Sequence, residues 1–158
     1  MPRKFTQSEE QLKPDPKFGD KVLSRFINSI MYDGKKAVAQ RVVYDAFELI
    51  EKRTKGEPPA IEVFRKAIDN VKPSVEVRSK RVGGANYQVP MQVNRRRQQS
   101  LAFRWIINAA RSERGRPMSQ RLSKELLDAA NGEGKAMSTR DQTHRMADAN
   151  KAFAHFAW

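Results

Sequence analysis

The chain of 158 residues contains no cysteine and only two histidines. The absence of cysteine excludes disulfides, thiolate nucleophiles and cysteine-bound zinc. The two histidines, His144 and His155, would stand about 16 Å apart on one continuous helix, so a single metal ion could not bind both. The sequence also contains neither a Gly-x-Ser-x-Gly motif nor a dinucleotide-binding fingerprint. We therefore expect a protein that is not an enzyme and that carries no metal and no cofactor.

Long hydrophobic runs are absent too. No apolar stretch approaches the roughly 20 residues that are needed to span a bilayer. The N-terminus lacks the hydrophobic region of a secretory signal, and no basic amphipathic helix with a wide apolar face stands apart from the rest. We expect a cytoplasmic protein, or one from the interior of an organelle, that has no membrane partner.

Acidic residues are scarce relative to basic ones. The chain holds 31 Lys plus Arg against 18 Asp plus Glu, which leaves a net charge of +13 and a pI near 10.3. A charge of this size opposes compaction through self-repulsion unless a polyanion or counterions offset it. The usual polyanion is nucleic acid, whose phosphates bind basic side chains regardless of sequence. The alternative is a soluble basic protein without such a ligand.

The charge is concentrated in residues 72–116, which carry +9 and leave +4 for the rest of the chain. Only two acidic residues, Glu76 and Glu113, lie in this stretch. Its basic residues are mostly arginines, whose planar groups match phosphate oxygens and stack on bases. We predict that the stretch forms the main RNA-binding surface, through charges that lack a partner within the chain. They are Lys72, Arg78, Lys80, Arg81, Arg95, Arg96, Arg97, Arg104, Arg111, Arg114 and Arg116.

Apolar residues recur at helical spacing in residues 22–31, 39–50 and 61–71, which predicts three helices. Asp33-Gly34 would end the first helix, and Pro59 would sit in the first turn of the third. The period then changes. Residues 74–91 alternate between apolar and polar positions on either side of Gly83-Gly84, which is typical of a β-hairpin with a tight turn. Pro90 marks the return strand as an edge.

Three more helices complete the prediction. Asn94 is a candidate N-cap for the fourth helix, and a further apolar stripe covers residues 122–130. Ser138 and Asp141 have the spacing of a capping box for the last helix, which runs through Met146 and Ala149 and could continue to Phe153 and Phe156.

We predict a mainly α fold, a bundle of about six helices with a protruding β-hairpin arm at residues 74–91. Residues 1–19 are polar and interrupted by proline, so we expect them to form an extended N-terminal tail. Residues 20–158 would form a single helical RNA-binding domain.

Spacing brings several basic residues together. Arg97, Arg104 and Arg111 recur every seven residues and so share one side of a helix. Arg78 and Lys80 share one face of the arm, because side chains two apart in a strand point the same way.

A Gly-Lys pair also precedes a predicted helix. The segment Asp33-Gly34-Lys35-Lys36 lacks the upstream glycine and the Ser or Thr of a nucleotide-binding phosphate loop. We interpret Lys35 and Lys36 as additional phosphate contacts.

Most aromatic residues fall on apolar stripes. Tyr87 on the arm could either pack within the chain or stack on a base. Three aromatic residues crowd the C-terminus, where they could dock on the bundle or on a partner: Phe153, Phe156 and Trp158. The aromatic residues that we assign to the core are Phe26, Phe47, Phe64 and Trp105. A DNA-architectural or regulatory protein is the alternative to an RNA-binding one, but neither a recognition helix nor dimer symmetry stands out.

Several motifs carry a resemblance to a known family. They are Asp33-Gly34-Lys35-Lys36, the segment from Val75 to Gly84, Tyr87-Gln88-Val89-Pro90, Arg104-Trp105, His144-Arg145-Met146-Ala147 and residues 149–155. In this order and spacing, over residues 14–158, the chain resembles small-subunit ribosomal protein seven of the bacterial and organellar type. The resemblance implies six helices with a β-hairpin arm, as the apolar pattern also does.

The resemblance further implies a primary binder of the 3′ major domain of small-subunit ribosomal RNA that initiates assembly of the subunit head. It implies small-subunit proteins nine, eleven and thirteen as neighbours, and places the arm and part of the last helix beside the exit site for transfer RNA. The ribosomal RNA contacts are then Arg3, Lys4, Lys35, Lys36 and the basic residues of 72–116. Those near transfer RNA are Arg81, Val82, Gly83, Gly84, Ala85, Arg140 and Arg145.

The chain departs from the family pattern at three places. Only Arg3 and Lys4 remain of a basic N-terminal run, Ser138-Thr139 replaces two lysines before Arg140, and Ala157 stands where arginine is usual. We therefore assign the main contacts to the arm and to residues 95–116.

Overall fold

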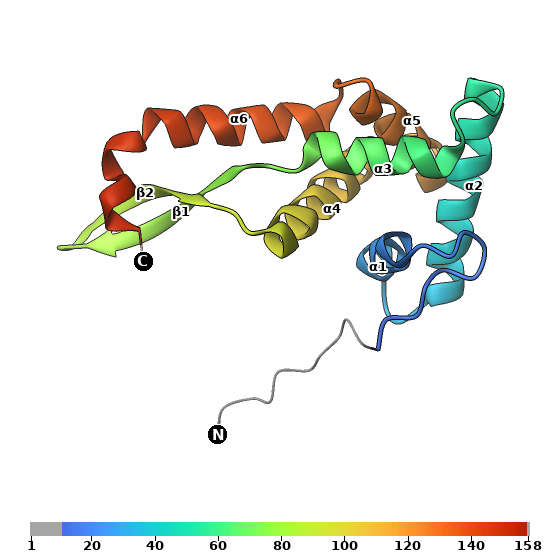
Figure 1. The fold of residues 1–158 in the computed structure, drawn as a ribbon, viewed down its shortest axis with the longest axis horizontal. Coiled ribbons are helices and arrows are strands. Elements are labelled where there is room, and N and C mark those ends of the chain that lie inside the picture. The colour runs from blue at the N-terminus through green and yellow to red at the C-terminus, as the bar shows by residue number, and fades with distance from the viewer. Residues whose placement is uncertain (1–10, 158) are drawn as a thin grey trace.

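The computed structural model describes residues 11–157 and shows a body of helices from which a two-stranded arm extends (Figure 1). This confirms the predicted mainly α fold with a β-hairpin arm. The elements, in chain order, are α1 (Lys21–Ile30), α2 (Lys36–Thr54), α3 (Ala60–Val71), β1 (Val75–Val82), β2 (Ala85–Gln92), α4 (Arg95–Ser112), α5 (Met118–Ala130), α6 (Lys135–Ala149) and the 3-10 helix η1 (Lys151–Phe156).

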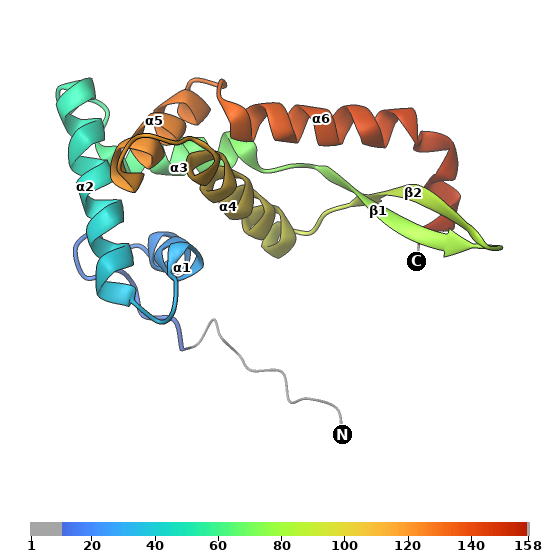
Figure 2. The same cartoon turned by 180° about the vertical axis from the view of Figure 1, so that it is seen from behind.

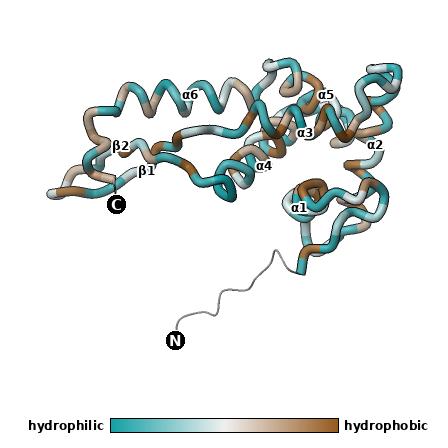
Figure 3. The backbone as a smooth tube through the Cα atoms, viewed as in Figure 1, coloured by the Kyte–Doolittle hydropathy of each residue, from teal (hydrophilic) through white to brown (hydrophobic). Residues whose placement is uncertain are grey.

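The core lies where α1 to α5 face one another. Phe26, Phe47 and Phe64 are fully buried there, as their apolar stripes predict. The Phe26 ring meets that of Phe64 at 5.2 Å and that of Phe103 at 5.3 Å, both edge to face, which is a favoured aromatic geometry. Trp105 is only half-buried and packs at the edge of this core. In Figure 3 the hydrophobic residues gather among these helices, whereas α6 is largely hydrophilic along its length.

The first helix is joined to the rest by a buried carboxylate. Asp20 accepts hydrogen bonds from the amides of Val22 (2.6 Å) and Leu23 (3.0 Å), so it caps α1. Its other oxygen pairs with the guanidinium of Arg65 on α3 at 2.6 Å. Burial by itself raises the pKa of Asp20, but the bonds from Arg65 and the two amides outweigh it and leave the pKa below its usual value.

Part of the segment that we predicted as a tail packs on α2. Asp15 is buried and accepts a hydrogen bond of 2.7 Å from the hydroxyl of Tyr44. Burial, and next this bond, raise the pKa of Tyr44 to about 12. The ring of Phe18 meets that of Phe47 at 5.2 Å. The packed part of the chain thus begins before residue 20.

Two predicted helix ends differ from the observed ones. The first helix ends at Ile30, and Met31 is already extended, so Asp33-Gly34 lies in the connection after the helix rather than at its end. Pro59 occupies the N-cap position of α3, one residue before the first turn.

The capping box predicted at Ser138 and Asp141 is wrong, because α6 begins one turn earlier, after Gly134. The cap comes from another helix: the buried carboxylate of Glu125 on α5 accepts a hydrogen bond of 2.8 Å from the amide of Ala136. Gly134 has a φ of +94°, and a Cβ there would lie 3.0 Å from Oε1 of Glu125. Tertiary packing therefore replaces the local cap.

The last helix ends at Ala149, within the predicted course, and does not take the longer course to Phe156. After Asn150 the chain turns into η1 and folds back onto the arm, so α6 does not continue to Phe156 (Figure 2). The C-terminal segment and the arm, which are far apart in sequence, lie side by side.

The arm is a regular antiparallel hairpin whose register runs from Val75 opposite Gln92 to Val82 opposite Ala85. Gly83 and Gly84 form the turn with φ values of +58° and +89°. Two successive positive φ angles define the hairpin turn that matches the twist of the strands and that glycine adopts without strain. At about 3.3 Å per residue, eight residues carry the tip roughly 26 Å from the base.

Candidate nucleic-acid interface

The two faces of the arm differ in what they contact. Directly paired residues of a hairpin share a face, so Lys80 lies on the same side as its partner Tyr87. That side is covered by η1: the ring of Tyr87 meets those of Phe153 at 5.2 Å and Phe156 at 5.1 Å. Tyr87 therefore packs within the chain. Lys80 donates a 2.7 Å hydrogen bond to the carbonyl of Phe156, so it also helps to hold the C-terminal segment.

Arg81 points to the opposite face of the arm, because adjacent residues of a strand alternate. This residue is exposed, and its side chain has no ion pair within the described part of the chain. The tip beyond it, which includes Gly83, Gly84 and Ala85, is exposed as well, while Val82 is half-buried. The outer end of the arm is thus available to a partner.

The base of the arm is tied to α4 by one carboxylate. The side chain of Glu76 is only 12% exposed and lies 3.2 Å from Nε of Arg78 and 3.0 Å from Nη2 of Arg97. Arg97 adds a second bond through its Nε, at 3.2 Å. This shared carboxylate sets the position of the arm relative to α4, and it neutralises part of the charge that we expected to be unpaired.

The arginines of helix α4 differ in what their side chains contact. Asn94 caps it as predicted, accepting a 2.9 Å bond from the amide of Arg97. At the far end Arg111 donates to the carbonyl of Ile30 at 3.0 Å. Of the three arginines with heptad spacing, Arg97 and Arg111 therefore contact the protein itself, and Arg104 between them is exposed.

The prediction that the basic residues of 72–116 lack internal partners is right for some of them and wrong for others. Lys72 pairs with Asp69 at 2.6 Å on the surface, and Arg96 also has an interaction within the chain. With the contacts above, six of the eleven are engaged. Within residues 11–157, the exposed ones without an ion pair or hydrogen bond from their side chains are Arg81, Arg95, Arg104, Arg114 and Arg116.

The remaining predicted RNA contacts fall in two places. Lys35 and Lys36 are exposed at the start of α2, close to the end of α4 that carries Arg111, since Lys35 and Arg111 line one groove. Arg3 and Lys4 lie outside the described residues. The described basic residues thus extend from the tip of the arm, along α4, to the start of α2.

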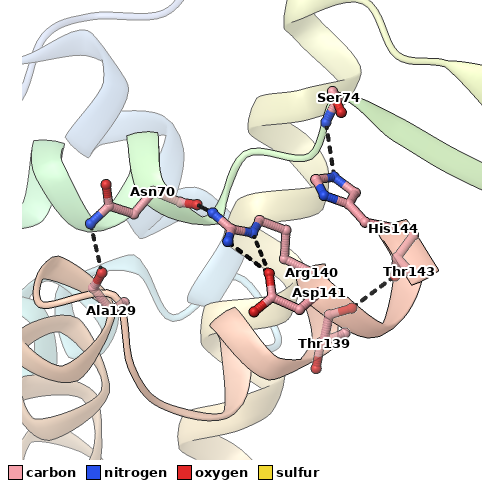
Figure 4. A network of polar contacts seen from close by, with 8 residues as sticks. All are labelled: Asn70, Ser74, Ala129, Thr139, Arg140, Asp141, Thr143 and His144. Carbon is pink, nitrogen blue, oxygen red and sulfur yellow. Dashed lines mark hydrogen bonds and ion pairs between the residues drawn. The ribbon is translucent and has the colours of Figure 1, made fainter.

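The two α6 residues predicted near transfer RNA have different surroundings. Arg140 is half-buried and donates to the carbonyl of Asn70 on α3 and to the carboxylate of Asp141 at 2.7 Å, so its guanidinium joins α6 to α3 (Figure 4). One turn on, Nε2 of His144 accepts a 3.2 Å bond from the amide of Ser74 at the base of the arm. Arg145 is exposed.

Sequence reasoning missed Tyr32, which lies in the connection between α1 and α2. The residue is 65% exposed, and the guanidinium of Arg111 lies 4.1 Å from the centre of its ring. The signal for this exposure was its place just after the apolar stripe of α1 and just before Asp33-Gly34. The contact with Arg111 had no signal, because the two residues are far apart in sequence.

No group of three metal-ligating side chains occurs among the residues that the structure describes. Nor is any described helix both long enough and apolar enough to cross a bilayer.

A family model described as "Ribosomal protein S7p/S5e" matches residues 2–151. The chain belongs to this family. The S7p/S5e family consists of structural ribosomal proteins, so both the resemblance and the expectation of a non-enzyme are confirmed. A small ribosomal subunit protein uS7 of Methylobacterium radiotolerans is 56% identical over 158 residues, which cover all of both chains. A uS7 of Rhodopirellula baltica is 60% identical over 155 residues, 98% of this chain and 99% of the relative.

Proposed function

We propose that the chain binds the 3′ major domain of small-subunit ribosomal RNA and initiates assembly of the subunit head. Membership of the S7p/S5e family makes it a structural constituent of the small ribosomal subunit. The observation that carries the finer proposal is the set of exposed arginines without an ion pair in the described part of the chain, namely Arg81, Arg95, Arg104, Arg114 and Arg116.

Four of these arginines lie on α4 or just after its end. At 1.5 Å per residue, Arg95 and Arg104 stand about 14 Å apart along α4, and Arg114 and Arg116 follow the end of the helix. Duplex nucleic acid carries roughly one charge per 1.7 Å of its axis, so several phosphates lie within this span. Nine residues at about 3.6 per turn place Arg95 and Arg104 on opposite sides of α4, so they would contact separate segments of the RNA. Each guanidinium can bind phosphates without first breaking an internal ion pair.

We place the arm and α6 beside the exit site for transfer RNA. The arm supports this because it protrudes from the body and ends in an exposed glycine turn with Arg81 next to it (Figure 1). We assign the contact on α6 to Arg145, which is exposed, and a positioning role to Arg140, whose guanidinium holds α6 against α3.

The location follows from the same proposal. We place the chain in a ribosome beside small-subunit proteins nine, eleven and thirteen, in the cytoplasm of a bacterium. An organelle interior is the alternative compartment.

The test is a salt titration of binding to a transcript of the 3′ major domain. Neutralising about eight phosphates predicts a log–log slope near −7. Replacing Arg95, Arg104 and Arg114 by alanine should make the slope shallower by about 2 to 3, since each lost contact removes roughly 0.7 to 0.9. The matched control removes the same charge from the exposed end of α2, at residues 52, 53 and 55, and should change the slope little.

A slope near zero would refute the electrostatic mechanism. Equal losses in the two triple variants would show that net charge, and not these three arginines, determines binding. Competition with duplex DNA addresses the alternative: equal affinity for DNA and for the transcript would favour a DNA-architectural protein.

A further inference from the structure

A groove lies between the α1–α2 connection and the facing ends of α4 and α5. Apolar side chains, among them Ile30, Val38 and Met118, form most of its lining. Its charged lining residues are three cations, Lys35, Arg111 and Arg121. Val38, which is 54% exposed, and Tyr32 are two of the four large hydrophobic side chains that are exposed in the described part of the chain. An apolar groove bordered by cations points to a ligand that is flat and apolar in one part and anionic in another.

The ring of Tyr32 is contacted by a fixed guanidinium. Arg111 lies over it at 4.1 Å, and its Nη2 is held by the carbonyl of Ile30. Arg121 donates in turn to the backbone carbonyl of Arg111, at 3.3 Å. The residue is 65% exposed, so Tyr32 leaves room for a second planar group beside Arg111.

The charged residues that line the groove are all cations. Three more exposed cations lie within three residues of a lining residue in the sequence, namely Lys36, Arg114 and Arg116. None of them has an ion pair within residues 11–157. The carboxylate of Glu113 is already paired with Lys124 at 3.2 Å. Asp33 is an exposed carboxylate next to Tyr32, but it does not line the groove.

We propose that this groove binds an unpaired nucleotide of RNA, with the base stacked on Tyr32 and the adjoining phosphates bound by Lys35 and its neighbours. The proposal rests on the RNA-binding function above and gives it a specific subsite. Proteins that recognise single-stranded RNA stack splayed bases on aromatic rings and on guanidinium planes, and both occur here in contact. Charge complementarity selects a nucleotide, because its phosphates match the cations while its base matches the apolar lining.

The experiment compares three variants, Tyr32→Ala, Tyr32→Leu and Tyr32→Phe, for binding to the 3′ major domain transcript across a salt series. Leucine keeps apolar bulk without a ring, and phenylalanine keeps the ring without the hydroxyl. Loss of one base–aromatic stack is expected to weaken binding by between about 5-fold and about 150-fold. We expect this loss for alanine and leucine, and wild-type affinity for phenylalanine.

The salt slope separates this subsite from the phosphate contacts. Tyrosine carries no charge, so all three variants should keep the wild-type slope while their affinities differ. Thermal unfolding checks the fold, and an exposed side chain should change the midpoint little. Met146→Ala, which removes another exposed apolar side chain, on α6, should leave the affinity unchanged.

The outcomes distinguish the two proposals. A wild-type chain that binds the transcript with no salt dependence would end the proposed function and the subsite with it. A steep wild-type slope with equal affinities for the alanine, leucine and phenylalanine variants would overturn the nucleotide subsite alone. That result would leave the groove to another ligand, such as an acidic protein segment.

Discussion

The buried carboxylate of Glu125 provides the sharpest test of how α6 is held in place. It lies on α5, is only 7% exposed and accepts the amide hydrogen of Ala136 in the first turn of α6. Changing Glu125→Ala leaves this amide without its acceptor. Loss of a helix cap costs about 0.5–2 kcal/mol, and a buried donor left without its acceptor costs about 1–3 kcal/mol. For a chain of this size, each kcal/mol lowers the unfolding midpoint by about 2–4 °C.

The matched variant Glu125→Gln keeps an oxygen that can accept the same bond but removes the charge. Burial raises the pKa of Glu125, and the bond from Ala136 only partly opposes this. The folded state therefore holds the proton more tightly than the unfolded state. The contribution of this group to the free energy of unfolding is highest at pH values below its ordinary pKa of 4.5. The contribution falls as the pH rises through the pKa of the folded state. Glutamine has no such loss.

The assay is thermal or denaturant unfolding of the wild-type chain and both variants at a series of pH values from acid to neutral. At neutral pH the alanine variant should be clearly less stable than the glutamine variant. The glutamine variant should gain stability relative to wild type as the pH rises above 4.5. Two results would refute the reasoning: alanine and glutamine variants of equal stability, or a wild-type-to-glutamine difference that does not change with pH.

Two further predictions concern the start of α4 and the arm. Arg95→Ala should make the salt slope of RNA binding shallower by about 0.7 to 0.9 and should leave the unfolding midpoint unchanged. Arg97→Ala should lower the unfolding midpoint, because it breaks the bonds to Glu76. The reverse pattern would contradict the assignment of free and engaged arginines. Tyr87→Ala removes two ring contacts, each worth about 0.5–1.5 kcal/mol. Hydrogen exchange of the arm amides should therefore become about 5- to 150-fold faster, while exchange in the helical core stays unchanged. Equal protection of the arm in both proteins would show that η1 does not hold the arm.

Much of the fold could be predicted because its signals are local. The apolar stripes of α1, α2 and α3, the alternation of β1 and β2, and the paired glycines of the turn each lie within one short segment. Asn94 could be identified as a cap for the same reason, since it bonds to the amide only three residues away. The start of α6 could not be predicted, because its cap, Glu125, lies on another helix, eleven residues before the amide of Ala136 that it binds.

The candidate interface was predicted in composition but not in detail. The concentration of arginine in residues 72–116 was apparent from the chain alone. The chain alone did not show which arginines are engaged, because their partners are distant in sequence. Arg97 binds Glu76, 21 residues away, and Arg111 binds the carbonyl of Ile30, 81 residues away. The position of Tyr87 likewise depended on a C-terminal segment that folds back onto the arm.

The sequence by itself determined the element types, the hairpin turn, the basic character of the middle stretch and the family, because periodicity, backbone preference and charge are properties of neighbouring residues. Only the tertiary structure decided which cations are available to a ligand, what caps α6, and that Tyr32 is stacked under Arg111. Each of these depends on contacts between distant segments. The packing of the core brings those segments together, and no local pattern specifies which side chains then meet.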